Sequence, residues 1–165
     1  PGDNFHSTNS HVLPGLIRKF YQAIENSENS VTCWGSGKPL REFLHADDLG
    51  RACVFALEEW DPSSINAPVD NEKNRLNLLN VGSGEEISIK ELAEMIGSFF
   101  DFKGKILWDI NKPDGTPRKK LDTKRLDDFG WKAKTDLDMG IRLTLKDGSA
   151  KANIINVNKK TNHIN

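Results

Sequence analysis

The stretch that organises the rest of the chain covers residues 34–49 and reads WGSGKPLREFLHADDL. Two glycines and a proline near its start predict a turn that follows an extended segment. Asp47 and Asp48 near its end predict the start of a helix, where carboxylates accept free backbone N–H groups and face the positive end of the helix dipole. Trp34 precedes the turn and Arg41 follows it. A planar ring and a forked cation this close together suit a ligand with a flat base or sugar face and a phosphate.

On both sides of this stretch, predicted strands alternate with predicted helices. Apolar residues spaced three and four apart predict helices over 12–24 and 47–59. Ser88 and Glu91 fit a capping box, which predicts a helix from there to about residue 100. The alternation favours the α/β fold class, or α+β. The remaining predicted elements are strands over 31–34, 76–81 and 105–108 and short helices over 123–128 and 137–145.

Size and charge restrict the class of protein. The 165 residues fit one ordinary domain. The 24 acidic residues nearly offset the 23 basic residues, which argues against a dedicated nucleic-acid or membrane-surface protein. No apolar run reaches the roughly 18 residues of a membrane span, and the start lacks a signal-peptide pattern. We therefore expect a cytoplasmic protein without nucleic-acid or membrane partners.

The two cysteines and the two Gly-Ser-Gly turns carry no recognisable cofactor pattern. Cys33 and Cys53 have apolar neighbours and no CxxC spacing, so both are predicted to be buried thiols. The absence of HExxH and CxxC spacing makes a catalytic metal improbable. Residues 35–37 and 82–84 lack the third glycine of a dinucleotide-binding fingerprint, so both are interpreted as plain turns.

Several polar residues are candidates for chemistry, each with a structural alternative. His11 lies at a predicted helix start, where an imidazole can exchange a proton with a ligand near neutral pH, although a lone histidine at a helix entry is more often a capping or surface residue. Trp34 could be a core residue, and Arg41 could pair with a neighbouring acid. The loop 112–120 carries four cations and one acid, which suits phosphates or a solvated turn.

Seven blocks of the sequence together resemble one known family. They are DNFH at 3–6, NSHVLP at 9–14, WGSG at 34–37, REFLH at 41–45, DDL at 47–49, LNVGSG at 79–84 and KPDGTPRK at 112–119. In combination they resemble the GDP-L-fucose synthase family, a branch of the extended short-chain dehydrogenase/reductase family. The likeness runs from residue 1 to about residue 145.

The resemblance implies an NADP(H)-dependent 3,5-epimerase and 4-reductase that converts GDP-4-keto-6-deoxy-D-mannose into GDP-L-fucose. In that chemistry a base removes the protons next to the C4 ketone and an acid returns them on the other face, before hydride reduces the ketone. The implied cofactor is NADP, the implied partner is a GDP-sugar, and the implied assembly is a homodimer.

The resemblance also implies roles for individual residues. His11 matches the family's acid/base histidine and is expected to contact the cofactor as well. Lys19, Trp34 and Arg41 match its sugar-nucleotide contacts. Asp114 lies in the loop that closes over the GDP-sugar, and Lys119 is a further substrate-binding candidate in that loop.

By this resemblance, residues 1–148 are the substrate-binding domain, the carboxy-terminal part of such an enzyme with the Rossmann half missing. The glycine-rich NADP turn, the serine, the Tyr-x-x-x-Lys pair and the family's catalytic cysteine are expected before Pro1, and neither Cys33 nor Cys53 takes that cysteine's position. Residues 149–165, rich in Lys and Asn, are expected to be a disordered or atypical tail.

Two other functions fit the same sequence. One is another sugar-nucleotide epimerase or dehydratase of the same superfamily, from which His11 and the loop 112–119 would distinguish this chain. The other is a non-catalytic sugar-nucleotide-binding module, which gains weight if the natural reading frame starts near Pro1.

Overall fold

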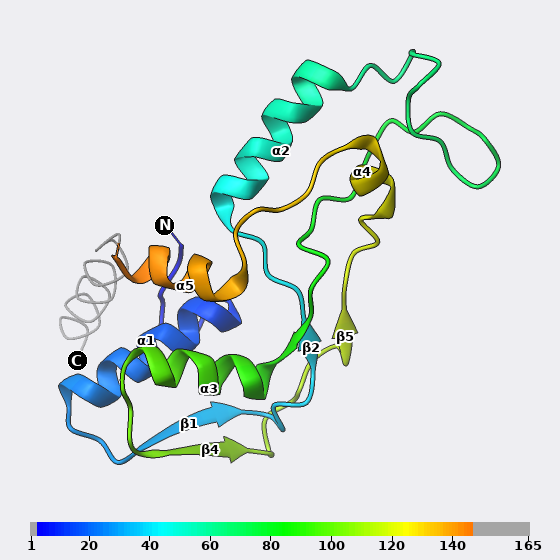
Figure 1. Cartoon of the computed structure of the whole chain (residues 1–165). Coiled ribbons are helices and arrows are strands. Elements are labelled where there is room, and N and C mark those ends of the chain that lie inside the picture. Colours follow the sequence, from blue (N-terminus) through cyan, green and yellow to red (C-terminus); the bar gives the residue numbers. More distant parts are fainter. Residues whose placement is uncertain (1–2, 147–165) are drawn as a thin grey trace. The chain divides into compact units, whose positions relative to one another are not determined.

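A computed structural model describes residues 3–146 (Figure 1). The described chain divides into two compact units, which we treat separately: unit 1 contains residues 3–40, 87–118 and 138–146, and unit 2 contains residues 41–86 and 119–137. The predicted tail, 149–165, lies outside the described residues. In chain order the elements are α1 (Val12–Glu25), β1 (Ser30–Trp34), β2 (Leu40–Arg41), α2 (Ala46–Glu59), β3 (Ile87–Ser88), α3 (Ile89–Phe99), β4 (Lys105–Asp109), β5 (Arg118–Lys119), α4 (Lys124–Phe129) and α5 (Leu137–Lys146).

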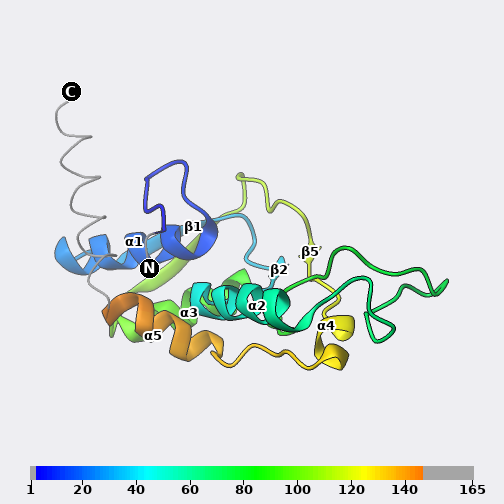
Figure 2. The same ribbon diagram turned by 90° about the horizontal axis from the view of Figure 1, so that it is seen from above.

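Unit 1 is built on a parallel pair of strands. Strand β1 pairs with β4 in a register that runs from Ser30 opposite Lys105 to Trp34 opposite Asp109. Helix α1 contacts both β1 and α3, and Figures 1 and 2 show the two helices near the paired strands. Side chains of β1 alternate, with Val31 and Cys33 buried and Trp34 exposed. This alternation follows from the two-residue period of a strand and places Trp34 on the outer face.

The core of unit 1 forms where the apolar faces of α1 and α3 meet. Phe20 is fully buried and its ring lies edge-on to that of Phe102, with centroids 5.4 Å apart. The predicted capping box of α3 is confirmed: the Ser88 hydroxyl accepts the Glu91 N–H at 3.1 Å, and the Glu91 carboxylate accepts the Ser88 N–H at 2.9 Å. The other buried apolar residues of unit 1 include Phe5, Leu16, Ile17, Ala23, Leu92, Ala93, Ile96 and Ile141.

Unit 2 has a smaller core, formed by α2, α4 and the segment that follows α4. Ala52, Leu126 and Trp131 are buried together, and partly buried apolar side chains surround them. Helix α4 ends at Gly130, as predicted, in a left-handed conformation (φ 114°) that glycine adopts without strain. None of the helices within residues 3–146 is long and apolar enough to cross a membrane.

The strand predicted over residues 76–81 is wrong. An isolated antiparallel bridge joins Val69 to Arg75, and the following residues form no strand in the described structure. Within this segment, the Leu76 N–H donates to the Pro68 carbonyl at 3.1 Å and the Asn80 side chain donates to the Asp122 carbonyl at 3.1 Å. Outside it, Glu42 accepts the N–H groups of Gly84 at 2.7 Å and Leu121 at 2.9 Å, one on each carboxylate oxygen. The segment is partly apolar, as predicted, but no neighbouring strand among the described residues pairs with it.

The helix start predicted at Asp47 and Asp48 is confirmed, since both lie in the first turn of α2, but neither carboxylate caps the helix as predicted. His45 occupies the N-cap position, and its Nδ1 accepts the Asp47 N–H at 3.2 Å. Asp48 is fully buried and accepts the N–H groups of Lys134 at 3.1 Å and Thr135 at 2.9 Å, while Arg51 forms an ion pair with it. Burial alone would raise the pKa of Asp48, but the hydrogen bonds from Lys134, Arg51 and Thr135 lower it well below its usual range. Asp48 therefore fastens α2 to residues 134–135 instead of capping its own helix.

The prediction that both cysteines are buried is correct for Cys33 and wrong for Cys53. Cys53 lies on a stripe of α2 with Leu49 and Leu57, and both leucines are exposed. The periodic pattern was assigned to the core, but Ala52 and Asp48 form the buried face of this helix. The spacing of apolar residues correctly predicted helix α2. Which face of α2 is buried depends on the segments that pack against it.

Asp48→Asn is expected to lower the free energy of unfolding by about 3 kcal/mol at pH 7, because the amide cannot pair ionically with Arg51 and accepts fewer hydrogen bonds. The folded-state pKa of Asp48 is lowered, so its stabilisation is present above the unfolded-state value of about 4 and declines as the pH falls below that value. Urea unfolding followed by circular dichroism measures the free energy of unfolding of both proteins. The difference between wild type and Asp48→Asn should become smaller as the pH is lowered from 5 to 3.

The matched control is Asp138→Asn, which removes an exposed carboxylate paired with Arg142 on α5. This change is expected to cost less than about 1 kcal/mol. If wild type and Asp48→Asn differ by the same free energy of unfolding over the whole pH range, the role assigned to the Asp48 charge is contradicted.

Candidate functional site

The exposed indole of Trp34 is the centre of the site in unit 1. Trp34 is the last residue of β1 and 56% of its surface is exposed, so it is not a core residue. The Nζ atom of Lys19, from the middle of α1, lies 5.5 Å from the ring centroid and also donates to the carbonyl oxygen of Thr32. That hydrogen bond fixes the ammonium group beside the ring. A cation at this distance is attracted to the π-system.

Lys19 is partly buried and interacts electrostatically with the buried Cys33. Burial lowers the pKa of Lys19, and the nearby Arg18 adds to this lowering while Cys33 opposes it. Burial raises the pKa of the Cys33 thiol, which keeps it protonated and unreactive. Because Lys19 is partly buried, its attraction for an anionic ligand is screened less than that of an exposed lysine.

A second cation reaches the same indole from the loop that follows β4. The Nζ atom of Lys112 also lies 5.5 Å from the centroid of the Trp34 ring. Asp114, two residues further along, accepts the Ser36 N–H on one carboxylate oxygen and the Ser36 hydroxyl on the other, the latter at 2.7 Å. These two hydrogen bonds lower the pKa of the Asp114 carboxyl, the backbone bond more than the hydroxyl bond. Unit 1 thus brings together Lys19, Trp34 and Asp114 of the predicted site residues.

The turn beside Trp34 is fixed on several sides. Gly35 has φ 77°, and a Cβ atom there would collide with the Asp114 carboxylate, so both backbone conformation and space require glycine. The Gly35 N–H donates to the Asp109 carbonyl at 2.9 Å, and the Gly37 carbonyl accepts the Lys90 N–H at 2.9 Å. The turn is therefore attached both to the end of β4 and to the start of α3.

His11 occupies the N-cap position of α1 and is exposed. Its carbonyl oxygen accepts the Gly15 N–H at 3.0 Å, but its imidazole forms no capping hydrogen bond. The ring is thus accessible for a ligand, and the structural alternative of a side-chain cap does not apply. Unit 1 contains His11 together with the indole cluster, whose residues are Lys19, Trp34 and Lys112.

The other two predicted residues belong to unit 2. Arg41 ends β2 and Lys119 ends β5, and these are neighbouring strands in the sheet of order β3-β2-β5. Lys119 is exposed and Arg41 is partly buried. Residue types at these positions suit contact with phosphate groups.

Sequence reasoning identified the loop 112–119 as a whole and missed the individual roles of Ser36 and Lys112. Ser36 is a small polar residue between two glycines, and its two donors are satisfied by an acid 78 positions further along the chain. The signal that could have found the pair is chemical: Asp114 is the one acid in the basic loop, and a carboxylate fits a turn with free N–H and O–H donors.

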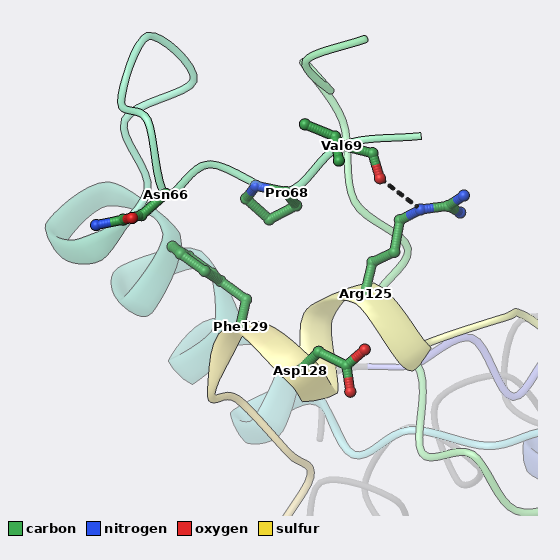
Figure 3. A pocket seen from close by; sticks show the side chains of 6 residues that line it. All are labelled: Asn66, Pro68, Val69, Arg125, Asp128 and Phe129. Carbon is green, nitrogen blue, oxygen red and sulfur yellow. Dashed lines mark hydrogen bonds between the residues drawn. The ribbon is translucent and has the colours of Figure 1, made fainter. Parts of the chain in front are cut away.

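A cavity in unit 2 does not involve any of the predicted residues. It encloses about 230 Å³, and Arg125 on its wall donates to the Val69 carbonyl at 3.1 Å (Figure 3). A second donor of the same guanidinium binds the Asn71 side chain at 3.0 Å, so this cation of α4 holds residues 69–71 in place. Within residues 3–146 no group of His, Cys, Asp and Glu side chains could hold a metal ion. The cavity is lined by Asn66, Pro68, Val69, Arg125, Asp128 and Phe129.

Part of the chain matches a known family model. Residues 1–67 match the NAD dependent epimerase/dehydratase family. A solved UDP-glucose 4-epimerase from Thermotoga maritima superposes with a TM-score of 0.65 at 18% identity, over 84% of this chain and 39% of that one. At that identity the likeness shows the fold alone. The fold is therefore mixed α/β with neighbours of the Rossmann-type epimerase and short-chain dehydrogenase/reductase class.

Closer similarities confirm the narrower resemblance. A putative GDP-L-fucose synthase 2 of Arabidopsis thaliana is 48% identical over 142 residues, 86% of this chain and 39% of that protein. The GDP-L-fucose synthase of Escherichia coli is 42% identical over 144 residues, 87% of this chain and 44% of that protein. A GDP-L-fucose synthetase from Naegleria fowleri solved with NADP superposes with a TM-score of 0.70 at 28% identity, over 90% of this chain and 44% of that one. The chain is thus homologous to GDP-L-fucose synthases and spans less than half of their length.

Trp34→Phe is expected to remove the tryptophan emission that iodide quenches most strongly, since the indole is exposed and two ammonium groups attract the anion. Lys112→Gln should lower the iodide quenching of Trp34 by roughly a factor of two and leave quenching by neutral acrylamide unchanged. Stern–Volmer titrations of each protein, with the Trp34→Phe signal subtracted, measure this difference. Unchanged iodide quenching in the Lys112 variant would refute the two-cation arrangement.

Proposed function

We propose that this chain is the carboxy-terminal, substrate-binding part of an NADP-dependent GDP-L-fucose synthase. The observation that carries the proposal is the exposed Trp34 indole with Lys19 and Lys112 each 5.5 Å from its centre, in a sequence 42% to 48% identical to named GDP-L-fucose synthases. An aromatic face suits a sugar or base, and paired ammonium groups suit a diphosphate. The complete enzyme epimerises C3 and C5 of GDP-4-keto-6-deoxy-D-mannose and reduces C4.

His11 is the proposed acid/base residue and a cofactor contact. The exposed imidazole delivers a proton to, or accepts one from, a carbon next to the C4 ketone, a role that suits an imidazole because it changes charge near neutral pH. The second group of the acid/base pair, a cysteine in the family, belongs to the part of the enzyme outside this chain. A proton removed from one face of C3 or C5 and returned on the other face inverts that carbon.

By the resemblance, cations and one aromatic ring are the proposed contacts of the substrate. Lys19 and Trp34 of unit 1 are the proposed contacts for the diphosphate and a flat ring, and Asp114 belongs to the loop proposed to cover the GDP-sugar. Arg41 and Lys119 of unit 2 are further proposed substrate contacts. Such positioning converts binding energy into reactivity by orienting the sugar for proton transfer.

NADP is the proposed cofactor, bound mainly outside this chain. The described residues do not fit a dinucleotide site of their own, because the turns at Gly35–Gly37 and Gly82–Gly84 lack the third glycine of the fingerprint. NADPH, when bound, supplies the hydride for C4. On the resemblance we also propose that residues 1–148 act as the substrate-binding domain of a cytoplasmic homodimer.

The isolated chain is expected to bind GDP weakly and NADPH not at all. Isothermal titration calorimetry should show that Trp34→Ala raises the Kd for GDP about tenfold, because the ring contact is lost. Lys124→Gln, which removes an exposed cation paired with Asp128, is the matched control and should leave the Kd unchanged. Tight NADPH binding by the isolated chain would contradict the proposal that this chain binds the substrate while NADP binds mainly outside it.

Joining this chain to the missing amino-terminal part of the Escherichia coli relative is expected to give an enzyme that converts GDP-4-keto-6-deoxy-D-mannose in the presence of NADPH. His11→Gln in that hybrid should lower the rate of solvent-hydrogen exchange at C3 and C5 about 100-fold or more, because the proton carrier is gone. Deuterium incorporation followed by mass spectrometry measures the exchange separately from reduction. Unaltered exchange would exclude His11 as the acid/base residue.

A further inference from the structure

The loop between β4 and β5 is exposed along its whole length, yet it is attached to the Trp34 turn at one point. Residues 111–117 are all exposed. At its ends the loop is held by Lys112 N–H to the Asp109 carbonyl at 3.1 Å and by the Pro117 carbonyl to the Leu40 N–H at 2.9 Å. In its middle, Asp114 binds Ser36 with both carboxylate oxygens. This paired contact is the one that brings the middle of the loop to the indole cluster.

We propose that Asp114 and Ser36 form a latch that holds Lys112 at the Trp34 indole, which Lys19 of α1 also approaches, so that Lys112 and Lys19 together select the diphosphate of a nucleoside diphosphate sugar. This inference rests on the proposed function and deepens it. Asp114 becomes a positioning residue, and Lys112 becomes a specificity-determining residue of the substrate site.

The chemistry of Asp114 supports a positioning role. An ionised carboxylate only accepts hydrogen bonds, and so does a diphosphate, so the two cannot bind each other directly. Both Asp114 oxygens are already engaged by the Ser36 N–H and hydroxyl. The same hydrogen bonds favour the ionised form of Asp114, as the lowered pKa of its carboxyl shows. The latch is therefore closed at neutral pH without a ligand.

The backbone links the latch to the cation. Pro113 lies between Lys112 and Asp114, and its ring fixes φ at about −65°, which removes one of the backbone rotations between these two residues. Anchoring Asp114 to Ser36 therefore restricts where the Lys112 ammonium can lie. Gly35 leaves room for the latch, because a side chain at this position would occupy the space of the Asp114 carboxylate.

Two ammonium groups at one ring predict a preference for higher ligand charge. Lys19 approaches from α1 and is additionally bound to the Thr32 carbonyl, while Lys112 approaches from the loop. A diphosphate carries more charge than a monophosphate and can contact both ammonium groups. We expect the described cluster to discriminate GDP from GMP and guanosine, and this discrimination should depend on Lys112.

The first experiment tests the latch without any ligand. Ser36→Ala and Asp114→Ala each remove one side of it, and Gly35→Ala displaces the carboxylate while keeping both partners. In ¹H–¹⁵N spectra, the Trp34 indole N–H, assigned by its loss in Trp34→Phe, is expected to shift in all three variants and in Lys112→Gln. Gly84→Ala is the matched control, since Gly84 also has φ 77° but a Cβ there would meet no atom closer than 3.7 Å. An indole signal that stays in place in Ser36→Ala and Asp114→Ala overturns the latch.

The second experiment tests the ligand preference by calorimetry with GDP, GMP and guanosine. Wild type is expected to bind GDP most tightly, and Lys112→Gln, Ser36→Ala and Asp114→Ala should each raise the Kd for GDP about threefold to tenfold while changing the Kd for guanosine little. Ser36→Ala is decisive, because it leaves the Asp114 charge in place. Equal losses for GDP and guanosine, or no loss in Ser36→Ala, overturn the inference.

The two experiments separate failure of the inference from failure of the proposed function. If wild type binds none of the three ligands, the proposed function of the isolated chain fails, while the indole shifts still decide on the latch. If wild type prefers GDP but Ser36→Ala and Lys112→Gln retain the full preference, the proposed function survives and the latch with its specificity role is wrong.

Discussion

The structure depends on carboxylates that bind backbone N–H groups of segments distant in the sequence. Asp48 is the most constrained of them, because it is fully buried and keeps its charge only while Lys134, Thr135 and Arg51 donate to it. Glu42 does the same for the loops around Gly84 and Leu121. Irregular segments rich in unpaired N–H groups need such acceptors, since no strand ladder is available to them. Unit 2, which has a small apolar core, is held together largely in this way.

In unit 1 a carboxylate that binds a distant segment stabilises the candidate site instead of the core. Asp114 accepts two hydrogen bonds from Ser36 and thereby attaches the exposed loop that carries Lys112 to the turn after β1. The parallel pair of β1 and β4 makes this possible, because parallel strands in register end at the same edge and place the turn after Trp34 next to the loop after Asp109. The strand register thus decides that Lys112 can reach the ring that Lys19 approaches from α1.

Amphipathic periodicity and capping chemistry made most elements predictable. The helix over residues 12–24, the capping box at Ser88 and the stop at Gly130 are local properties, fixed by side chains within a few positions of one another. Two errors have a common cause. The segment 76–81 has the composition of a strand but no partner, and Cys53 lies on an apolar stripe of α2 that the described chain leaves exposed. Both outcomes depend on neighbours that no local pattern specifies.

The sequence by itself determined the helices, the two paired strands, the turn after Trp34 and the similarity to GDP-L-fucose synthases, because these depend on local spacing or on motif blocks. It also marked Lys19, Trp34 and Asp114 as site candidates by resemblance. Only the tertiary structure decided that two ammonium groups approach the exposed Trp34 indole, that Ser36 binds both oxygens of Asp114, and that Asp48 fastens residues 134–135. The contacts of Ser36 and Asp48 join residues 78 to 87 positions apart, and their partners are set by how the strands and helices pack, which periodicity alone does not encode.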